Sequence, residues 1–75
     1  MRVTITYAIE PVDGRYLVWR RIGDAEPVAL AIGTSSRPRR FTSRYDAESA
    51  IESARRADVA AGTRLGVDVE VVIYR

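Results

Sequence analysis

The stretch that decides the fold is residues 43–62, SRYDAESAIESARRADVAAG. Ser43 and Asp46 fit the S-x-x-D capping box, in which a serine hydroxyl and a carboxylate each satisfy a free backbone N–H at the start of a helix. Small apolar residues, mostly alanines, then recur at three- and four-residue spacing, and Gly62 stands where a helix commonly ends. The pattern predicts one helix that ends at Gly62, with an alanine stripe that lets it lie close against a sheet.

The segments on both sides of this helix alternate between apolar and polar residues, as half-buried strands do. Residues 2–9 alternate before a turn at residues 10–14, residues 15–22 and 28–32 follow, and residues 67–74 come after the helix. We expect the last of these strands to be a central one. The order β-β-β-α-β predicts an α+β fold, a four-stranded, mainly antiparallel sheet with one helix packed on one face and the other face open.

The chain has 75 residues, and its twelve basic residues are all arginine, with no lysine, histidine or cysteine. This length predicts one small α+β domain spanning residues 1–75. The missing types remove the ordinary general base near neutral pH, the thiol nucleophile, the Schiff-base amine and the usual nitrogen and sulfur ligands of zinc. We therefore expect no catalytic residue, metal ion, cofactor or small-molecule substrate.

The sequence also lacks signals for targeting or membrane insertion. The N-terminus alternates from its second residue, unlike a signal peptide, and no apolar run approaches the length that spans a bilayer. The expected location is the cytoplasm, with no membrane partner.

Positive charge is concentrated in the first part of the chain. Residues 1–45 contain eight arginines and four acids, whereas residues 46–75 contain four arginines and six acids. Residues 37–44, RPRRFTSR, combine arginines with hydroxyls beside a helix N-terminus, and all of these groups contact phosphate in nucleic-acid complexes. The candidate residues for binding nucleic acid or another partner are Arg15, Trp19, Arg20, Arg21, Arg37, Arg39, Arg40, Thr42, Ser43 and Arg44.

The alternation within residues 15–22 does not decide which face of the strand is buried, because both sides carry apolar residues. If Trp19 faces away from the helix, it joins Arg15, Arg21 and Tyr74 in an exposed aromatic and arginine surface. Such surfaces stack bases or anchor protein interfaces. If Trp19 faces the helix, it is the largest residue of the core.

The order of these features resembles the N-terminal arm-DNA-binding domain of phage tyrosine recombinases. The likeness covers roughly residues 15–61, from the strand that bears arginine and tryptophan, through residues 39–43 (RRFTS) at the strand-to-helix corner, to an alanine-lined helix near Ala47. In that family a three-stranded sheet precedes the helix and enters the DNA major groove. The resemblance implies DNA contacts from the sheet by Arg15, Trp19, Arg20 and Arg21. This chain departs from the family pattern in having one more strand on each side of the region.

These features support two functional hypotheses, neither of them catalytic. The first is a nucleic-acid-binding module, favoured by the basic patch. The second is a small protein-binding or inhibitor protein, of the kind that phages and mobile elements encode, which docks by its open sheet face or by the loop at residues 33–40. The low net charge of +2 favours this second hypothesis. A homodimer joined by sheet faces or edges belongs to the same class.

Overall fold

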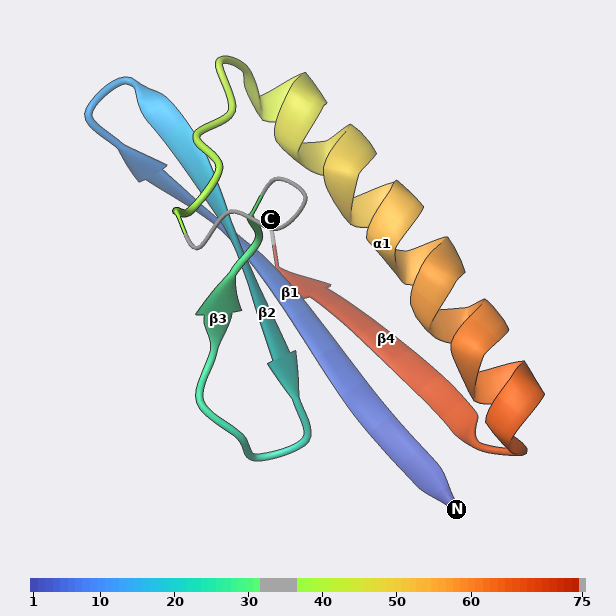
Figure 1. The fold of residues 1–75 in the computed structure, drawn as a ribbon. Helices are drawn as coiled ribbons and strands as arrows, with labels where there is room; N and C mark the ends of the chain where they lie inside the picture. Colours follow the sequence, from blue (N-terminus) through green and yellow to red (C-terminus); the bar gives the residue numbers. More distant parts are fainter. Residues whose placement is uncertain (32–36, 75) are drawn as a thin grey trace.

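A computed structural model of the chain describes residues 1–31 and 37–74. Its elements are β1 (Arg2–Val12), β2 (Arg15–Ile22), β3 (Val28–Ala29), α1 (Arg44–Leu65) and β4 (Asp68–Tyr74). The strands form one sheet in the order β3-β2-β1-β4, and α1 packs on the sheet (Figure 1). The predicted α+β class, element order and four-stranded sheet with one helix are confirmed.

β1 and β2 form a long antiparallel hairpin that turns at Asp13 and Gly14. Val12 pairs with Arg15 across the turn. Asp13 and Gly14 have φ angles of 49° and 75°, and a two-residue hairpin turn favours positive φ at both positions, which Asp-Gly supplies. β1 therefore continues to Val12 instead of ending at residue 9, because the residues expected in the turn still pair with β2.

β4 runs parallel to β1 and forms one edge of the sheet. Val3 lies beside Val69 and Tyr7 beside Ile73 in this pairing. The prediction that β4 is a central strand is wrong, because β1 and β2 hold the interior positions. The apolar residues that suggested a central strand, Val69 and Ile73 among them, instead pack towards the core.

α1 begins where the sequence predicts. Ser43 is the N-cap, and its hydroxyl oxygen accepts a hydrogen bond from the Asp46 backbone N–H at 3.1 Å. The Asp46 carboxylate in turn accepts one from the Thr42 hydroxyl at 3.1 Å. A carboxylate in the first turn also suits the positive end of the helix dipole.

The C-terminal end of α1 differs from the prediction. The helix runs through Gly62 to Leu65, and Gly66 with φ 69° is its left-handed cap. Gly62 is buried, and a Cβ atom added at this position would collide with the Val69 side chain and lie 2.8 Å from the Val67 carbonyl oxygen. Glycine here serves the close approach of α1 to β4 and does not end the helix. Within the described part of the chain, no helix is long and apolar enough to cross a membrane.

The hydrophobic core lies between α1 and the sheet. Its buried residues are Ile5, Tyr7, Val18, Phe41, Ala47 and Ile51. They come from β1, β2, the segment before α1, and α1 itself, so the core joins parts of the chain that are distant in sequence. The alanine stripe predicted from the spacing contributes Ala47, with Ala50 and Ala54 partly buried beside it.

β3 is shorter than the sequence predicts, covering Val28–Ala29 instead of residues 28–32. Leu30 continues the pairing by donating to the Val18 carbonyl oxygen at 2.9 Å, and its own carbonyl accepts from Arg39 at 2.8 Å. Half of the loop predicted at 33–40, namely residues 33–36, lies outside the described residues, as does residue 32.

Candidate functional site

The two faces of β2 have different roles. Val18 is buried in the core and Tyr16 packs against the core. The residues of β2 that alternate with these two therefore point to the opposite face of the sheet. Trp19 is on that opposite face, together with Arg15 and Arg21. The question that the sequence leaves open is thus decided, and Trp19 is not a residue of the core under α1.

Arg20 lies on the covered face and binds α1. Its Nη2 and Nε atoms donate to the two carboxylate oxygens of Asp58 at 2.6 and 3.2 Å, and the Tyr7 hydroxyl donates to the same carboxylate. The side chains of Arg20 and Asp58 are only 29% and 13% exposed. The structure therefore does not bring Arg20 together with Trp19 and Arg21, and gives it a structural role between β2 and α1.

This contact changes the acidity of its members. Burial raises the pKa of Tyr7 to about 12, and its hydrogen bond to the Asp58 carboxylate adds to the shift, because both oppose formation of the phenolate. The hydrogen bond to Asp58 also raises the pKa of Arg20. The guanidinium and the phenol accordingly keep their ordinary charge states through the neutral range.

The segment before α1 carries its arginines to the hairpin end of the sheet. Phe41 forms an antiparallel bridge with Tyr16, with N–H to carbonyl distances of 3.0 and 2.9 Å. The Arg39 guanidinium lies over the Phe41 ring at 4.7 Å, and that of Arg44 over the Tyr16 ring at 5.7 Å. Cation–π contacts of this kind hold a guanidinium in place without neutralising it.

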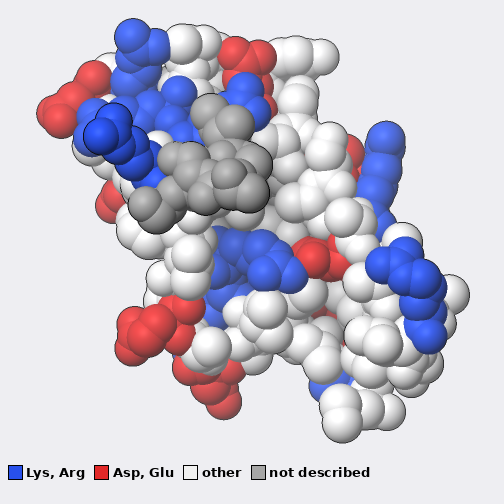
Figure 2. All heavy atoms as spheres, viewed as in Figure 1, with Lys and Arg blue, Asp and Glu red and all other residues white. Residues whose placement is uncertain are grey.

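The bridge between Tyr16 and Phe41 also indicates on which face of the sheet Arg40 lies. Extending its antiparallel register by one residue in each direction places Arg40 opposite Leu17 and Thr42 opposite Arg15. Since Leu17 and Arg15 alternate with the covered residues of β2, this register puts Arg40 on the side of the sheet that carries Trp19. Figure 2 shows basic side chains gathered over this end of the molecule, with acidic ones at its margin.

The arginines differ in whether a carboxylate already neutralises them. The ion pairs are Arg2–Glu70, Arg20–Asp58, Arg21–Asp24 and Arg55–Glu52. In contrast, Arg15, Arg39, Arg40 and Arg44 are exposed and form no ion pair within residues 1–31 and 37–74. Arg37 is also exposed and belongs to the same segment. Four guanidinium groups thus remain available to an anionic partner at one end of the sheet.

Thr42 and Ser43, predicted as phosphate-contacting residues, both interact with Asp46 at the start of α1. The Ser43 hydroxyl caps the helix, the Thr42 hydroxyl donates to the Asp46 carboxylate, and that carboxylate occupies the positive end of the helix dipole. A second anion at this position would meet that carboxylate. The geometry therefore favours the arginines over the helix N-terminus as the phosphate-contacting groups.

The open face carries two aromatic rings in one row. Trp19 on β2 and Tyr74 on β4 lie on either side of Ala8 in the registers of the sheet. The Trp19 indole N–H donates to the Glu10 carboxylate at 3.3 Å, and Tyr74 is 63% exposed. The strands that carry the two rings are two strand spacings apart, about 10 Å. The small side chain of Ala8 on the strand between them leaves the space between the rings open.

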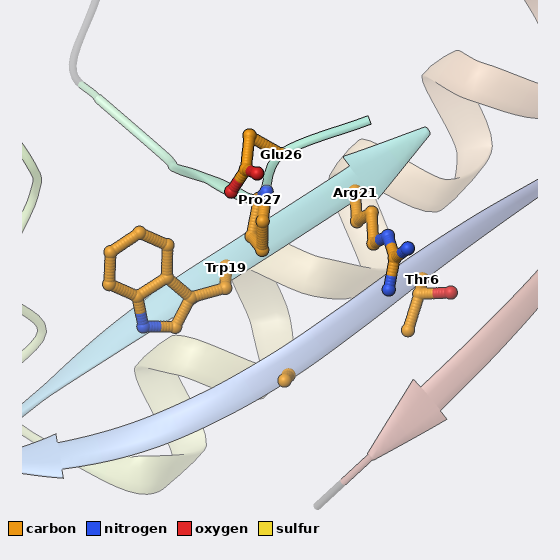
Figure 3. A pocket seen from close by; sticks show the side chains of 6 residues that line it. Thr6, Trp19, Arg21, Glu26 and Pro27 are labelled. Carbon is orange, nitrogen blue, oxygen red and sulfur yellow. The ribbon is translucent and has the colours of Figure 1, made fainter. Parts of the chain in front are cut away.

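A cavity of about 530 Å³ opens beside Trp19 on this face (Figure 3). It is lined by Thr6, Ala8, Trp19, Arg21, Glu26 and Pro27. Figure 3 shows Trp19 and Arg21 projecting from the same strand, with the Arg21 guanidinium directed towards Thr6 of β1. The cavity combines a flat aromatic wall with a guanidinium group.

The net charge of the open face is balanced, unlike that of the hairpin end. Its strand residues include the basic Arg2, Arg15 and Arg21 and the acidic Glu10, Asp68 and Glu70. Arg2 is 3.2 Å from Glu70, and Arg21 is 3.7 Å from Asp24. Two of these three strand arginines, Arg2 and Arg21, are thus already paired within the chain.

Some residues of these surfaces were not singled out from the sequence. Asp58 carries a sequence signal, because it continues the spacing of the buried stripe after Ile51 and Ala54, and an acid on that stripe indicates a buried partner. The sequence gives no such signal for Glu26 and Pro27, because their position beside Trp19 depends on how the chain leads from β2 into β3. Among the described residues, no cluster of acidic side chains is arranged to hold a metal ion.

Comparison of the chain with protein-family models, with curated proteins and with solved structures gives no match. The resemblance to the arm-DNA-binding domain therefore rests on its sequence features alone.

Proposed function

We propose that this protein is a non-catalytic module that binds single-stranded nucleic acid. The arginines at the hairpin end contact the phosphates, and the open sheet face stacks the bases. The observation that carries the proposal is the gathering of Arg15, Arg39, Arg40 and Arg44 at one end of the sheet without carboxylate partners among the described residues. An anionic ligand there can contact these guanidinium groups without breaking any of the ion pairs described above.

The supporting rings of Phe41 and Tyr16 add to this argument. Arg39 and Arg44 are already positioned over these rings, so less side-chain freedom is lost when a phosphate binds. The guanidinium fork also suits phosphate oxygens, which it contacts in pairs. Sequence specificity is not expected from such contacts, because phosphates are the same at every base.

The open face supports a single strand over a duplex. Trp19 and Tyr74 expose aromatic surface in one row, and stacking on a side chain requires the face of an unpaired base. The cavity beside Trp19 has room for one base against the indole, with Arg21 on its other side. Arg40 and Arg15 lie between this row and the hairpin end, so one strand can contact both surfaces.

The test is fluorescence anisotropy of labelled single-stranded and duplex DNA and RNA, measured across a salt series. We expect tighter binding to single strands, and affinity that falls as salt rises. Replacing Arg39 and Arg40 with alanine should weaken binding and reduce the salt slope by about one unit for each phosphate that the variant no longer neutralises.

The matched control replaces Arg56 and Arg64 with alanine, because both are exposed residues of α1 and the change in net charge is the same. Binding should then change little. Equal losses of affinity in the two double variants would show general electrostatic attraction in place of a site, and absence of binding at low salt would refute the proposal.

A protein partner is the second candidate, and the balanced charge of the open face favours it. Trp19 and Tyr74 are residue types that dominate protein interfaces, and a neutral face with exposed rings is what such an interface presents. This alternative predicts no nucleic-acid binding at low salt. It also predicts that any partner captured from the host is lost on Trp19→Ala and kept on Arg39→Ala with Arg40→Ala.

A further inference from the structure

The two edges of the sheet are protected very differently. At one edge, β3 is two residues long, and the chain beyond it folds back through a bridge between Ala31 and Pro38. At the other edge, β4 presents seven residues, Asp68–Tyr74, with no proline or glycine. Short strands, prolines, irregular segments and charged side chains are the usual protection of sheet edges. Of these, β4 has only its two acids, Asp68 and Glu70.

The hydrogen bonds of β4 show which backbone groups this edge offers. The Asp68 N–H donates to the Met1 carbonyl oxygen at 2.9 Å, so the backbone groups of Asp68 point towards β1. Backbone direction alternates along a strand. The N–H and C=O groups of Val69, Val71 and Ile73 therefore point outwards, away from the sheet.

We infer that β4 pairs with β4 of a second copy of this chain, antiparallel and centred on Val71, to form one continuous sheet. In this register Val71 faces Val71 of the other copy, and Val69 faces Ile73. All three are residues whose backbone groups point outwards, and residues paired in this way exchange two hydrogen bonds. Every outward N–H and C=O of the strand then has a partner.

The side chains agree with the same register. On the open face, Glu70 comes to lie opposite Val72 of the other copy, and Asp68 opposite Tyr74. No acid faces another acid, although the strand contains two of them. On the covered face, the pairs are valine with valine and valine with isoleucine, which are favourable across strands.

The neighbouring symmetric registers are less suitable. A shift that centres the pairing on Glu70 places that carboxylate opposite its own copy, and like charges in that position are destabilising. A shift that centres it on Val72 places Asp68 and Val69 beyond Tyr74, the last residue of β4 in the other copy, and so pairs less of the strand. Centring on Val71 is the arrangement that pairs the whole of Asp68–Tyr74 without a like-charge pair.

Packing also favours a second copy at this edge. Val69, Val71 and Ile73 lie against the core yet stay only partly buried, because nothing flanks β4 on its outer side among the described residues. A two-fold axis perpendicular to the sheet keeps both α1 helices on the same side, so the second copy extends the layer that covers these residues. A 75-residue chain buries a small share of its surface and gains proportionally more from such a contact.

The test introduces either a negative or a positive side chain at the same position, Val72. Val72→Glu places a second acid opposite Glu70 of the other copy, whereas Val72→Lys places a base there. Val72 lies on the open face, so both variants replace a half-buried valine by a long polar side chain, and urea unfolding measures how much each one costs the monomer, where Glu70 is a neighbour on the same strand. Since the contact occurs twice in the dimer, we expect Val72→Glu to raise the dimer dissociation constant about tenfold and Val72→Lys to leave it equal or lower.

Sedimentation velocity over a concentration series gives the dissociation constants, with urea unfolding of each variant as the check on folding. A wild-type chain that stays at its monomer mass of 8.4 kDa at every concentration would overturn the inference. So would a dimer that Val72→Glu and Val72→Lys affect equally, since the contact would then lie elsewhere, for example between the open faces.

Amide hydrogen exchange on the wild-type chain decides the matter even if a variant fails to fold. The N–H groups of Val69, Val71 and Ile73 should be protected in a concentrated sample and exchange quickly in a dilute one. Fast exchange at these amides in a sample shown to be dimeric would refute the pairing of β4.

Discussion

The covered and open faces of the sheet are built from the same strands but have different chemistry. On the covered face, β1 and β2 contribute Ile5, Tyr7 and Val18 to the core, and the charge of Arg20 is matched by Asp58. On the open face, Trp19 is half exposed, and its indole N–H donates to the exposed carboxylate of Glu10. The comparison teaches that one alternation separates the residues that determine stability from those that can bind a partner.

The largest expected effect is a core truncation. Ile51 is 2% exposed, and Ile51→Ala should lower the free energy of unfolding by about 2–5 kcal/mol through reduced burial and a cavity. Trp19→Ala removes a larger side chain from the open face and should cost about 1 kcal/mol or less. Urea unfolding of both variants makes the comparison. If Trp19→Ala were the more damaging change, the assignment of the two faces would be reversed.

The next effect concerns the charge pair of the covered face. Asp58→Ala leaves the Arg20 guanidinium partly buried without its partner, and we expect a decrease of about 2–3 kcal/mol in the free energy of unfolding. The control is Glu52→Ala, which removes the partner of the more exposed Arg55 and should lower the free energy of unfolding much less. Similar decreases in the two variants would contradict a special role for the contact between Arg20 and Asp58.

A third test uses pH on the same face. The folded state holds the Tyr7 proton more tightly than the unfolded chain does, because the pKa of Tyr7 is about 12 against an ordinary value of 10. This contribution is complete below about pH 10 and is lost as pH rises towards 12, by about 2 kcal/mol in total.

Urea midpoints measured through that range, with tyrosinate absorbance recorded in parallel, follow the decline. Tyr7→Phe is the control, because the variant has no phenol at this position and should show a flatter dependence on pH. An identical alkaline decline in both proteins would mean that other groups cause it.

The smallest effect belongs to the open face. Trp19→Phe keeps an aromatic ring there, so we expect the free energy of unfolding to change by about 0.5 kcal/mol or less, with affinity for single-stranded nucleic acid reduced about threefold at most. Trp19→Ala removes the ring and should reduce that affinity about tenfold. Anisotropy titrations at one fixed salt concentration separate the two. Equal affinities of both variants would remove Trp19 from the binding surface.

The elements of the fold could be predicted because their signals are local. The capping residues Ser43 and Asp46 and the period of the strands are visible within a few residues. The prediction that the helix ends at Gly62 is wrong because two glycines fit a helix end, and contact with Val69 is what keeps the first of them inside. No local pattern reports a contact with a strand that comes later in the chain.

The site was predictable only in part for the same reason. The arginines of residues 37–44 stand out in the sequence, and the structure places them together at the hairpin end. Alternation alone places Arg20 on the opposite face of β2 from Trp19 and Arg21. Which of these two faces α1 covers could not be read from β2, since both sides of that strand are apolar. It follows from the contact of Arg20 with Asp58, a residue on a different element.

The parallel pairing of β1 with β4 has a consequence for how the protein is made. Arg2 lies beside Asp68 in the sheet, so β1 is synthesised well before the strand with which it pairs in parallel. Until then β1 can pair only with β2, and α1 has no β4 to pack against. Contacts between such distant residues form slowly. We therefore expect the chain to complete its fold only after β4 has left the ribosome, and a nascent chain halted before residue 68 to expose one edge of β1.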